Sequence, residues 1–209
     1  MSRGILTVVS GFSGAGKGTL MKELLGQYDN YALSISCTTR KPREGEVDGV
    51  HYFFKTKEEF ETMISENGFL EHAQYVGNYY GTPRAYVEEM LDQGKDVILE
   101  IEIQGALNVR NLVPDVLLLF VTPPSAEVLE NRLVGRGTET AEVIRSRMNR
   151  AVEEAEYMDQ YDYLVINDDL QTCVKEMHAL IQAQHNRVAN RGDMIEKMKK
   201  ELKDRKENA

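Results

Sequence analysis

The stretch that decides the fold is Gly11-Phe12-Ser13-Gly14-Ala15-Gly16-Lys17-Gly18-Thr19, which lies between an apolar run and a helical pattern. The apolar run, residues 5–10, predicts a buried strand, and residues 20–27 predict a helix. A glycine-rich turn in this position can aim successive backbone N–H groups into one concavity, where the helix dipole also attracts anions. All nine residues of the stretch are therefore predicted to bind the phosphates of a nucleotide, as a P-loop does.

Lys17 and the two residues after it complete this loop. The lysine is expected to supply a mobile point charge to the outer phosphates. The strict pattern has Ser or Thr directly after the lysine, but Gly18 stands there and Thr19 follows. Thr19 is thus the hydroxyl expected to contact Mg²⁺ or its water. A flexible glycine-rich turn without a ligand is the alternative reading.

Composition excludes several classes of protein. The chain has 209 residues, a formal net charge of -9 and 28% charged residues, and this acidity argues against nucleic acid as the main partner. No stretch approaches the ~20 apolar residues that cross a bilayer, so no membrane partner is expected.

The N-terminal residues lead straight into a strand, and Cys37 and Cys173 show no pairing pattern. We therefore expect no signal peptide and a cytoplasmic location.

Four further apolar segments predict strands that join the first in a parallel sheet: residues 32–36, 96–103, 116–121 and 163–167. Helical patterns lie between them, so right-handed crossovers should cover both faces of the sheet in a three-layer α/β fold. Because side chains alternate along a strand, Glu100 and Glu102 are expected on the same face, near the ligand-binding end of the sheet.

Two segments interrupt this order. Residues 34–93 should hold a polar loop over 37–46, a hairpin over 69–80 and a helix that starts at Thr82-Pro83. Residues 125–159 should form an arginine-rich helical hairpin. The expected division is a core (1–33, 94–124 and 160–209), an insertion (34–93) and a lid (125–159), in one folding unit. Beyond residue 191 we expect a solvated helix extension or a frayed tail.

Several motifs in this order are similar to those of guanylate kinases, from residue 5 to about residue 170. They are Ser36-Cys37-Thr38-Thr39-Arg40-Lys41-Pro42-Arg43-Glu44-Gly45-Glu46, Phe69-Leu70-Glu71, Gly77-Asn78-Tyr79-Tyr80-Gly81-Thr82, Gln104-Gly105, Arg132-Leu133 with Arg136-Gly137-Thr138-Glu139, and Asn167-Asp168. The resemblance implies a P-loop NTPase-type fold with a mixed GMP-binding insertion and a helical lid. It also implies a cytosolic kinase of purine nucleotide metabolism and GMP recycling, which moves the γ-phosphoryl group of ATP to GMP or dGMP with Mg²⁺. The sequence leaves open whether the chain is a monomer or a homodimer.

The resemblance also implies which residues bind GMP. Arg40 and Arg43 would clamp its phosphate, since guanidinium forks suit a phosphate dianion. Glu71 would read guanine, because a carboxylate accepts from the adjacent N1–H and N2–H₂ donors that adenine lacks. The other GMP contacts implied are Ser36, Tyr52, Tyr80, Thr82 and Glu102, although an aspartate is more familiar at the position of Glu102.

The lid and the donor side receive roles in the same way. Arg132, Arg136 and Arg147 resemble arginines that neutralise the transferring phosphoryl group as the lid closes, and with Lys17 and Arg40 they form the expected catalytic set. Asn167 would lie at the adenine side of ATP, and Glu100 would act with Thr19 at the metal. Arg145 and Arg150 are expected on a solvated helix face. Phe12 stands where the family often has proline.

Two other functions remain open from the sequence. The fold could serve as a peptide-binding scaffold without catalysis, although such modules typically have degraded phosphate loops and this chain keeps Lys17, Arg40 and Arg43. The chain could also be a kinase for another nucleoside monophosphate. Glu71 and the stretch around Tyr80 and Thr82 argue against that second reading.

Overall fold

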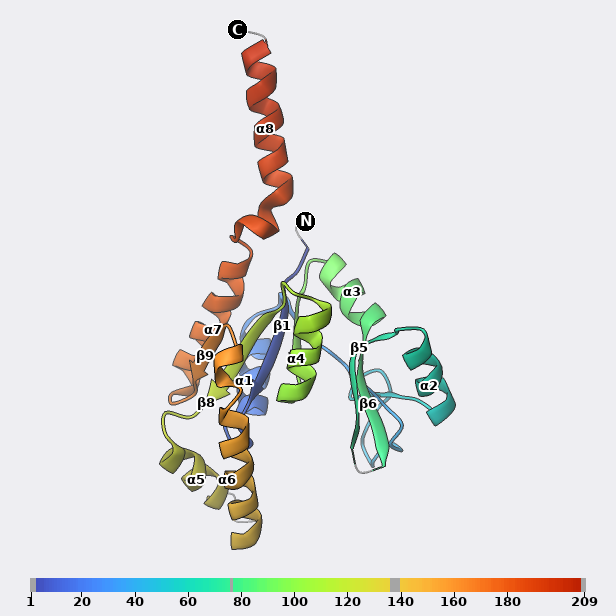
Figure 1. The fold of residues 1–209 in the computed structure, drawn as a ribbon, viewed down its shortest axis with the longest axis vertical. Helices are drawn as coiled ribbons and strands as arrows, with labels where there is room; N and C mark the ends of the chain where they lie inside the picture. Colours follow the sequence, from blue (N-terminus) through green and yellow to red (C-terminus); the bar gives the residue numbers. More distant parts are fainter. Residues whose placement is uncertain (1–2, 76, 136–139, 208–209) are drawn as a thin grey trace.

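The central sheet of the computed structural model has five parallel strands in the order β2-β7-β1-β8-β9 (Figure 1). The structure describes residues 3–75, 77–135 and 140–207. The strands are β1 (Leu6–Gly11), β2 (Tyr31–Leu33), β7 (Asp96–Glu100), β8 (Leu117–Thr122) and β9 (Tyr163–Ile166). The expected α/β fold with a parallel core is thereby confirmed.

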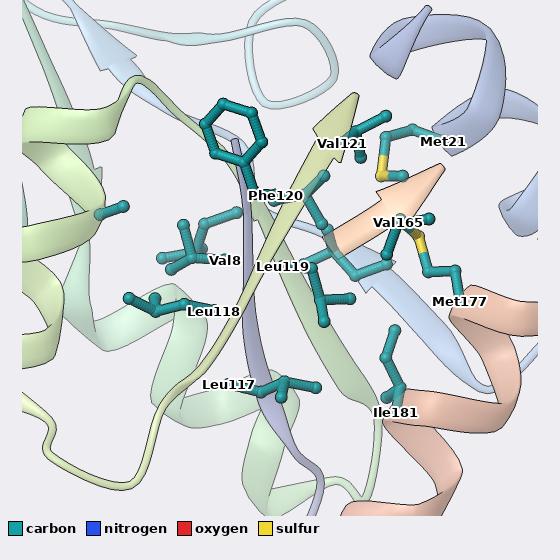
Figure 2. Close-up of a cluster of buried hydrophobic side chains, with 14 of the residues drawn as sticks. Val8, Met21, Leu117, Leu118, Leu119, Phe120, Val121, Val165, Met177 and Ile181 are labelled. Carbon is teal, nitrogen blue, oxygen red and sulfur yellow. The ribbon is translucent and has the colours of Figure 1, made fainter. Parts of the chain in front are cut away.

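Strand β8 shows why the sheet is central. Its side chains alternate between two buried faces, so nearly every position is apolar. Figure 2 shows Leu117, Leu119 and Val121 pointing to the same side as Met21, Met177 and Ile181. On the opposite side Leu118 lies beside Val8. The P-loop therefore begins at the end of a strand that is packed from both sides.

Helices cover the two faces of this sheet. Helices α1 (Lys17–Gln27) and α7 (Leu170–Gln184) pack together against one face, and the other face is covered by α3 (Arg84–Asp92) and α4 (Ile103–Leu112). Helix α7 starts as expected, because the Asp169 side chain accepts a hydrogen bond from the backbone N–H of Thr172 at 2.9 Å.

A second, four-stranded sheet lies beside the first in the order β4-β3-β6-β5. Its strands are β3 (Cys37–Thr38), β4 (Phe53–Phe54), β5 (Phe69–Tyr75) and β6 (Asn78–Pro83). Strands β5 and β6 form the expected antiparallel hairpin, whereas β3 pairs in parallel with β4. Helix α2 (Lys57–Ser65) begins with a capping box between Thr56 and Glu59 and buries Phe60 against this sheet.

Three local predictions were wrong. Cys37 and Thr38 were expected in a loop, but they form a strand because β4 and β6 pair with both of its edges. Thr82 was expected to cap a helix, but it lies in β6 and the cap position falls on Pro83. The strand expected over residues 96–103 ends at Glu100, so alternation does not relate Glu100 to Glu102, which is the N-cap residue of α4.

The arginine-rich segment forms α5 (Ala126–Val134) and α6 (Ala141–Ala155), followed by a short 3₁₀ turn, η1 (Met158–Gln160). In Figure 1 both helices lie beyond the carboxyl ends of the central strands, on the side where the P-loop begins α1. At the opposite end, η2 (Val188–Arg191) leads into α8 (Gly192–Glu207), which projects from the body and buries no residue. The solvated helix extension is confirmed. None of the described helices combines the length and the apolar character that crossing a bilayer requires.

Candidate active site

The P-loop owes its shape to glycines in unusual backbone conformations. Gly14 and Gly16 have φ of 96° and 89°, which residues with a side chain rarely adopt. A Cβ on Gly11 would lie 2.0 Å from the carbonyl oxygen of Val121 in the neighbouring strand. Gly16 is the N-cap residue of α1, so the loop delivers its backbone directly to the positive end of the helix dipole.

Lys17 lies across the mouth of this loop. Its Nζ donates to the carbonyl oxygens of Gly11 and Phe12 at 2.6 and 3.1 Å. The ammonium group therefore lies over the start of the loop, where it can exchange backbone partners for phosphate oxygens. Phe12 itself is buried and packs edge to face on Phe120, with ring centroids 5.0 Å apart, so an aromatic contact anchors the position where the family often has proline.

The segment expected to form a lid, which contains α5 and α6, contacts the P-loop through two of its arginines. Arg147 Nη1 donates to Ser13 Oγ at 3.0 Å, and Arg132 Nη1 reaches the carbonyl of Ala15 at 3.4 Å. Arg132 Nη2 also donates to the backbone oxygen of Asn167 at 2.7 Å, and the Asn167 amide donates to Ala15 at 2.8 Å. The structure thus brings Arg132, Arg147 and Asn167 together at the P-loop. Arg136 lies outside the described residues.

Three of the residues expected at the GMP phosphate meet beside the second sheet, where Tyr80 belongs to β6 and Arg40 and Tyr52 lie next to β3 and β4. The guanidinium carbon of Arg40 lies 5.4 Å from the ring centre of Tyr52, and the nearby Tyr80 hydroxyl helps Glu46 to raise the pKa of Arg40. The rings of Tyr52 and Tyr80 are 6.2 Å apart. Arg43 belongs to the same loop with an exposed side chain, so it is free to turn toward an incoming anion.

Glu71 and Thr82 face each other across the β5–β6 hairpin, where they are register partners. Thr82 Oγ1 donates to Glu71 Oε1 at 2.6 Å, and Thr82 is 1% exposed. Burial raises the pKa of the Glu71 carboxyl, and the Thr82 hydrogen bond opposes that rise. The second carboxylate oxygen lies 3.3 Å from the position of a Cβ on Gly105, so a side chain at residue 105 would crowd the carboxylate.

Glu100 and Glu102 line one cavity of about 460 Å³ together with Gly11, Ser13, Lys17, Arg147 and Arg150. The protein atoms around Glu100 remove part of its hydration and raise the pKa of its carboxyl, and the charge of Lys17 opposes that rise. Glu102 is paired with Arg150 of the lid at 2.7 Å. The cavity therefore joins the P-loop, the end of β7 and the lid helix α6.

Two other residues predicted for the site, Thr19 and Ser36, make no side-chain contact with it that the structure shows among the described residues. Thr19 is exposed on α1 and is not among the residues that line this cavity, and a Cβ on Gly18 would meet nothing within 4 Å. Ser36 contributes its backbone oxygen to Phe53 N at 2.9 Å. The two thiols are buried, and burial raises the pKa of both Cys37 and Cys173 to about 11, which suits packed rather than reactive groups.

Three charged residues near the site were missed by sequence reasoning. Glu46 forms an ion pair with Arg40, and Arg150, expected on a solvated face, joins Glu102 to Glu154 at 2.7 and 2.9 Å. The i,i+4 spacing of Arg150 and Glu154 was the available signal for that pair. The contact to Glu102 is set by how the lid lies on the core, which no local pattern reports.

Comparison with known proteins gives a consistent result. A family model described as guanylate kinase matches residues 3–184. A guanylate kinase of Clostridioides difficile is 51% identical over 203 residues, which cover 97% of this chain and 99% of the relative. One from Bacillus subtilis is 56% identical over 184 residues, covering 88% and 90%. The crystal structure of guanylate kinase from Anaplasma phagocytophilum superposes with a TM-score of 0.69 at 30% identity, over 90% of each chain.

Proposed function

The chain belongs to the guanylate kinase family, and on that premise we propose that it transfers the γ-phosphoryl group of ATP to GMP or dGMP, giving ADP and the guanosine diphosphate. It is then an ATP:GMP phosphotransferase of purine nucleotide metabolism and GMP recycling. The observation that carries the choice of acceptor is the hydrogen-bonded pair of the partly buried Glu71 and the buried Thr82.

The donor half of the site is the P-loop. Residues 11–19 would bind the phosphates of ATP through backbone N–H groups at the start of α1. Lys17 would leave the carbonyls of Gly11 and Phe12 for the outer phosphates. Asn167, which is 6% exposed and bonded to Ala15, would support the loop at the adenine side of ATP.

The acceptor half is the second sheet. The Glu71 carboxylate would accept from N1–H and N2–H₂ of guanine, while Thr82, Ser36 and Glu102 supply further polar contacts to the base. Arg40 and Arg43 would bind the phosphate of GMP with the hydroxyls of Tyr52 and Tyr80. AMP is rejected because it would leave the desolvated Glu71 carboxylate without its donors.

Phosphoryl transfer asks little covalent chemistry of the protein, so positioning and charge stabilisation dominate. Arg132, Arg136 and Arg147 of the lid would move onto the transferring group and exclude water as the lid closes. The contacts of Arg132 to Ala15 and Asn167, and of Arg147 to Ser13, support this role because they hold both arginines beside the loop that would bind the donor phosphates.

Mg²⁺ is the metal expected with ATP. The described residues hold no group of three or more His, Cys, Asp or Glu arranged around a metal ion. That fits magnesium, which usually keeps several waters and binds substrate phosphates with one or two carboxylates. Glu100, beside Lys17 in the cavity, would hold such a water shell, and the exposed Thr19 would contribute only indirectly. The metal would neutralise charge on the phosphates.

We further propose a cytoplasmic enzyme that works as a monomer or a homodimer, without a nucleic acid or membrane partner. The net charge of -9 argues against a nucleic acid partner, because nucleic acids are themselves negatively charged. The interaction-scaffold alternative needs no phosphate chemistry, whereas this chain keeps the whole P-loop geometry and a lysine at its mouth.

A coupled assay with ATP and each of GMP, dGMP, AMP, CMP and UMP tests the proposal. GMP should be far ahead, with dGMP next, because both present the guanine edge to Glu71. Equal or faster turnover of AMP would refute the guanine assignment. An absence of turnover with every acceptor, together with binding of GMP, would favour the scaffold.

A further inference from the structure

Arg40, the residue expected to grip the phosphate of GMP, is already held by a carboxylate of its own loop. Its Nη1 donates to Glu46 Oε2 at 2.9 Å and its Nη2 donates to Glu46 Oε1 at 2.8 Å. This is the two-bond geometry that planar guanidinium and carboxylate groups favour. The two side chains are only 16% and 18% exposed, so solvent screens the pair less than it screens a surface ion pair.

Glu46 is itself fixed to the backbone. The N–H of Arg43 donates to Glu46 Oε2 at 2.6 Å, and the N–H of Glu46 donates back to the carbonyl of Arg43 at 3.0 Å. Gly45 makes this tight turn possible with a φ of 83°. The hydrogen bonds from Arg40 and Arg43 lower the pKa of Glu46 to about 2, so the carboxylate stays ionised at neutral pH.

The contacts of Arg40 leave one side of its guanidinium for a ligand. A guanidinium has five N–H donors, which form one fork between the two terminal nitrogens and another between Nε and Nη2. Glu46 occupies the first fork, and Nη1 also donates to the carbonyl of Lys41 at 2.8 Å. Among the described residues, no hydrogen bond from Nε is found. Tyr52 lies against the face of the group, with 5.4 Å between the guanidinium carbon and the ring centre.

We propose that Glu46 is a positioning residue for the acceptor phosphate: it holds Arg40 by one fork so that the other fork meets the phosphate of GMP. This inference rests on the proposed function. An arginine side chain has large rotamer freedom, and ordering it before GMP arrives removes that cost from binding. The alternative is that Glu46 competes with the phosphate for Arg40. In that case GMP would have to displace the carboxylate, which would lose its hydrogen bonds to both Arg40 and Arg43.

The same loop offers a matched control. Glu44 is two residues away and carries the same charge, but it is exposed. Replacing Glu44 changes the net charge of the loop by the same amount as replacing Glu46, without touching the Arg40 pair. The comparison of Glu46→Ala with Glu44→Ala therefore separates positioning from a general change in electrostatic attraction.

The experiment measures kinetics and binding of the full chain. Glu46→Ala should raise the KM for GMP about tenfold, as expected for loss of a charge-assisted hydrogen-bonded pair, with the KM for ATP changed less than about twofold. Glu46→Gln should lie between, because its amide offers one acceptor oxygen. Glu44→Ala should match the parent protein. Calorimetry should show weaker GMP binding in Glu46→Ala but unchanged binding of guanosine, which has no phosphate.

The outcomes are distinguishable. A parent protein that binds no GMP refutes the proposed function and with it this role of Glu46. If the parent binds GMP and Glu46→Ala binds it equally well, the positioning role is wrong and the function stands. Tighter GMP binding in Glu46→Ala would mean that the carboxylate competes with the phosphate. Equal losses for GMP and guanosine would show a merely structural role, and if Glu46→Ala does not fold, Glu46→Gln gives the same comparison.

Discussion

Arg150 Nη2 lies 2.7 Å from Glu102 Oε2, and this ion pair ties lid helix α6 to the residue that caps α4. The two side chains are 51% and 77% exposed, so we expect a coupling free energy below about 1 kcal/mol for the pair. A double-mutant cycle with Arg150→Ala and Glu102→Ala, followed by thermal unfolding, measures it. Arg145→Ala, on the same helix and exposed, is the control.

Lys17→Ala should lower kcat by about 10²–10³-fold, because the variant loses a charge that is placed at the donor phosphates. The fold should survive, since the lysine is partly exposed and is not among the buried residues of the core. Lys22→Ala, exposed on the same helix, should keep the parent rate. An unchanged kcat in Lys17→Ala would show that the lysine does not stabilise the transition state.

Glu71 should make GMP use sensitive to acid. Its pKa is raised by burial, so protonation begins at a higher pH than for an ordinary glutamate, and the protonated group loses an acceptor for guanine. As pH falls, kcat/KM for GMP should therefore drop early in the parent protein. Glu71→Gln should have a higher KM for GMP at neutral pH. Its kcat/KM should not show the early drop at acid pH, because glutamine does not titrate.

Two comparisons isolate the effect of Glu71. The phosphate of GMP also titrates near pH 6, but it does so equally in both proteins, so the ratio of their profiles reports the carboxyl. Glu61→Gln, an exposed change in α2, should behave as the parent. If Glu71→Gln raises the KM for ATP as much as that for GMP, Glu71 does not read the base.

Gly18→Ser should be accepted without strain, because a Cβ there meets nothing within 4 Å. Serine is the better helix former by about 0.5 kcal/mol, so the melting temperature should rise by roughly 1–2 °C. The hydroxyl next to Lys17 should lower the Mg²⁺ concentration needed for half-maximal rate. Gly26→Ser, equally unobstructed at the far end of α1, should leave that concentration unchanged. If both variants show the parent's Mg²⁺ dependence, metal handling does not depend on this position.

The parts of the fold that could be predicted from sequence are those with a local cause. Strand β8 is a continuous apolar run because it is buried on both faces, and Asp169 caps α7 through its own side chain. The P-loop could be predicted for the same reason, since Gly14 and Gly16 are required by the backbone conformations they adopt.

The parts that were missed depend on distant partners. Strand β3 is two residues long and exists because β4 and β6 flank it. Threonine is a residue type that often caps helices, but the Thr82 hydroxyl instead donates a hydrogen bond to Glu71 across the hairpin. Alternation relates Glu100 to Glu102 only while a strand continues, and β7 ends between them. The roles assigned to the individual site residues stay predictions until the variants are measured.

Helix α8 should open locally at a lower free-energy cost than the core, because it packs against no other element over most of its length. None of its residues is buried, so its backbone amides are protected from hydrogen exchange only by the helix's own bonds. They should exchange far faster than those of β1 and β8, whose strands open only when the whole core does. Because α8 projects away from the end of the sheet that carries the P-loop (Figure 1), a fluorophore or a surface linker attached along it would stand clear of the nucleotide cleft.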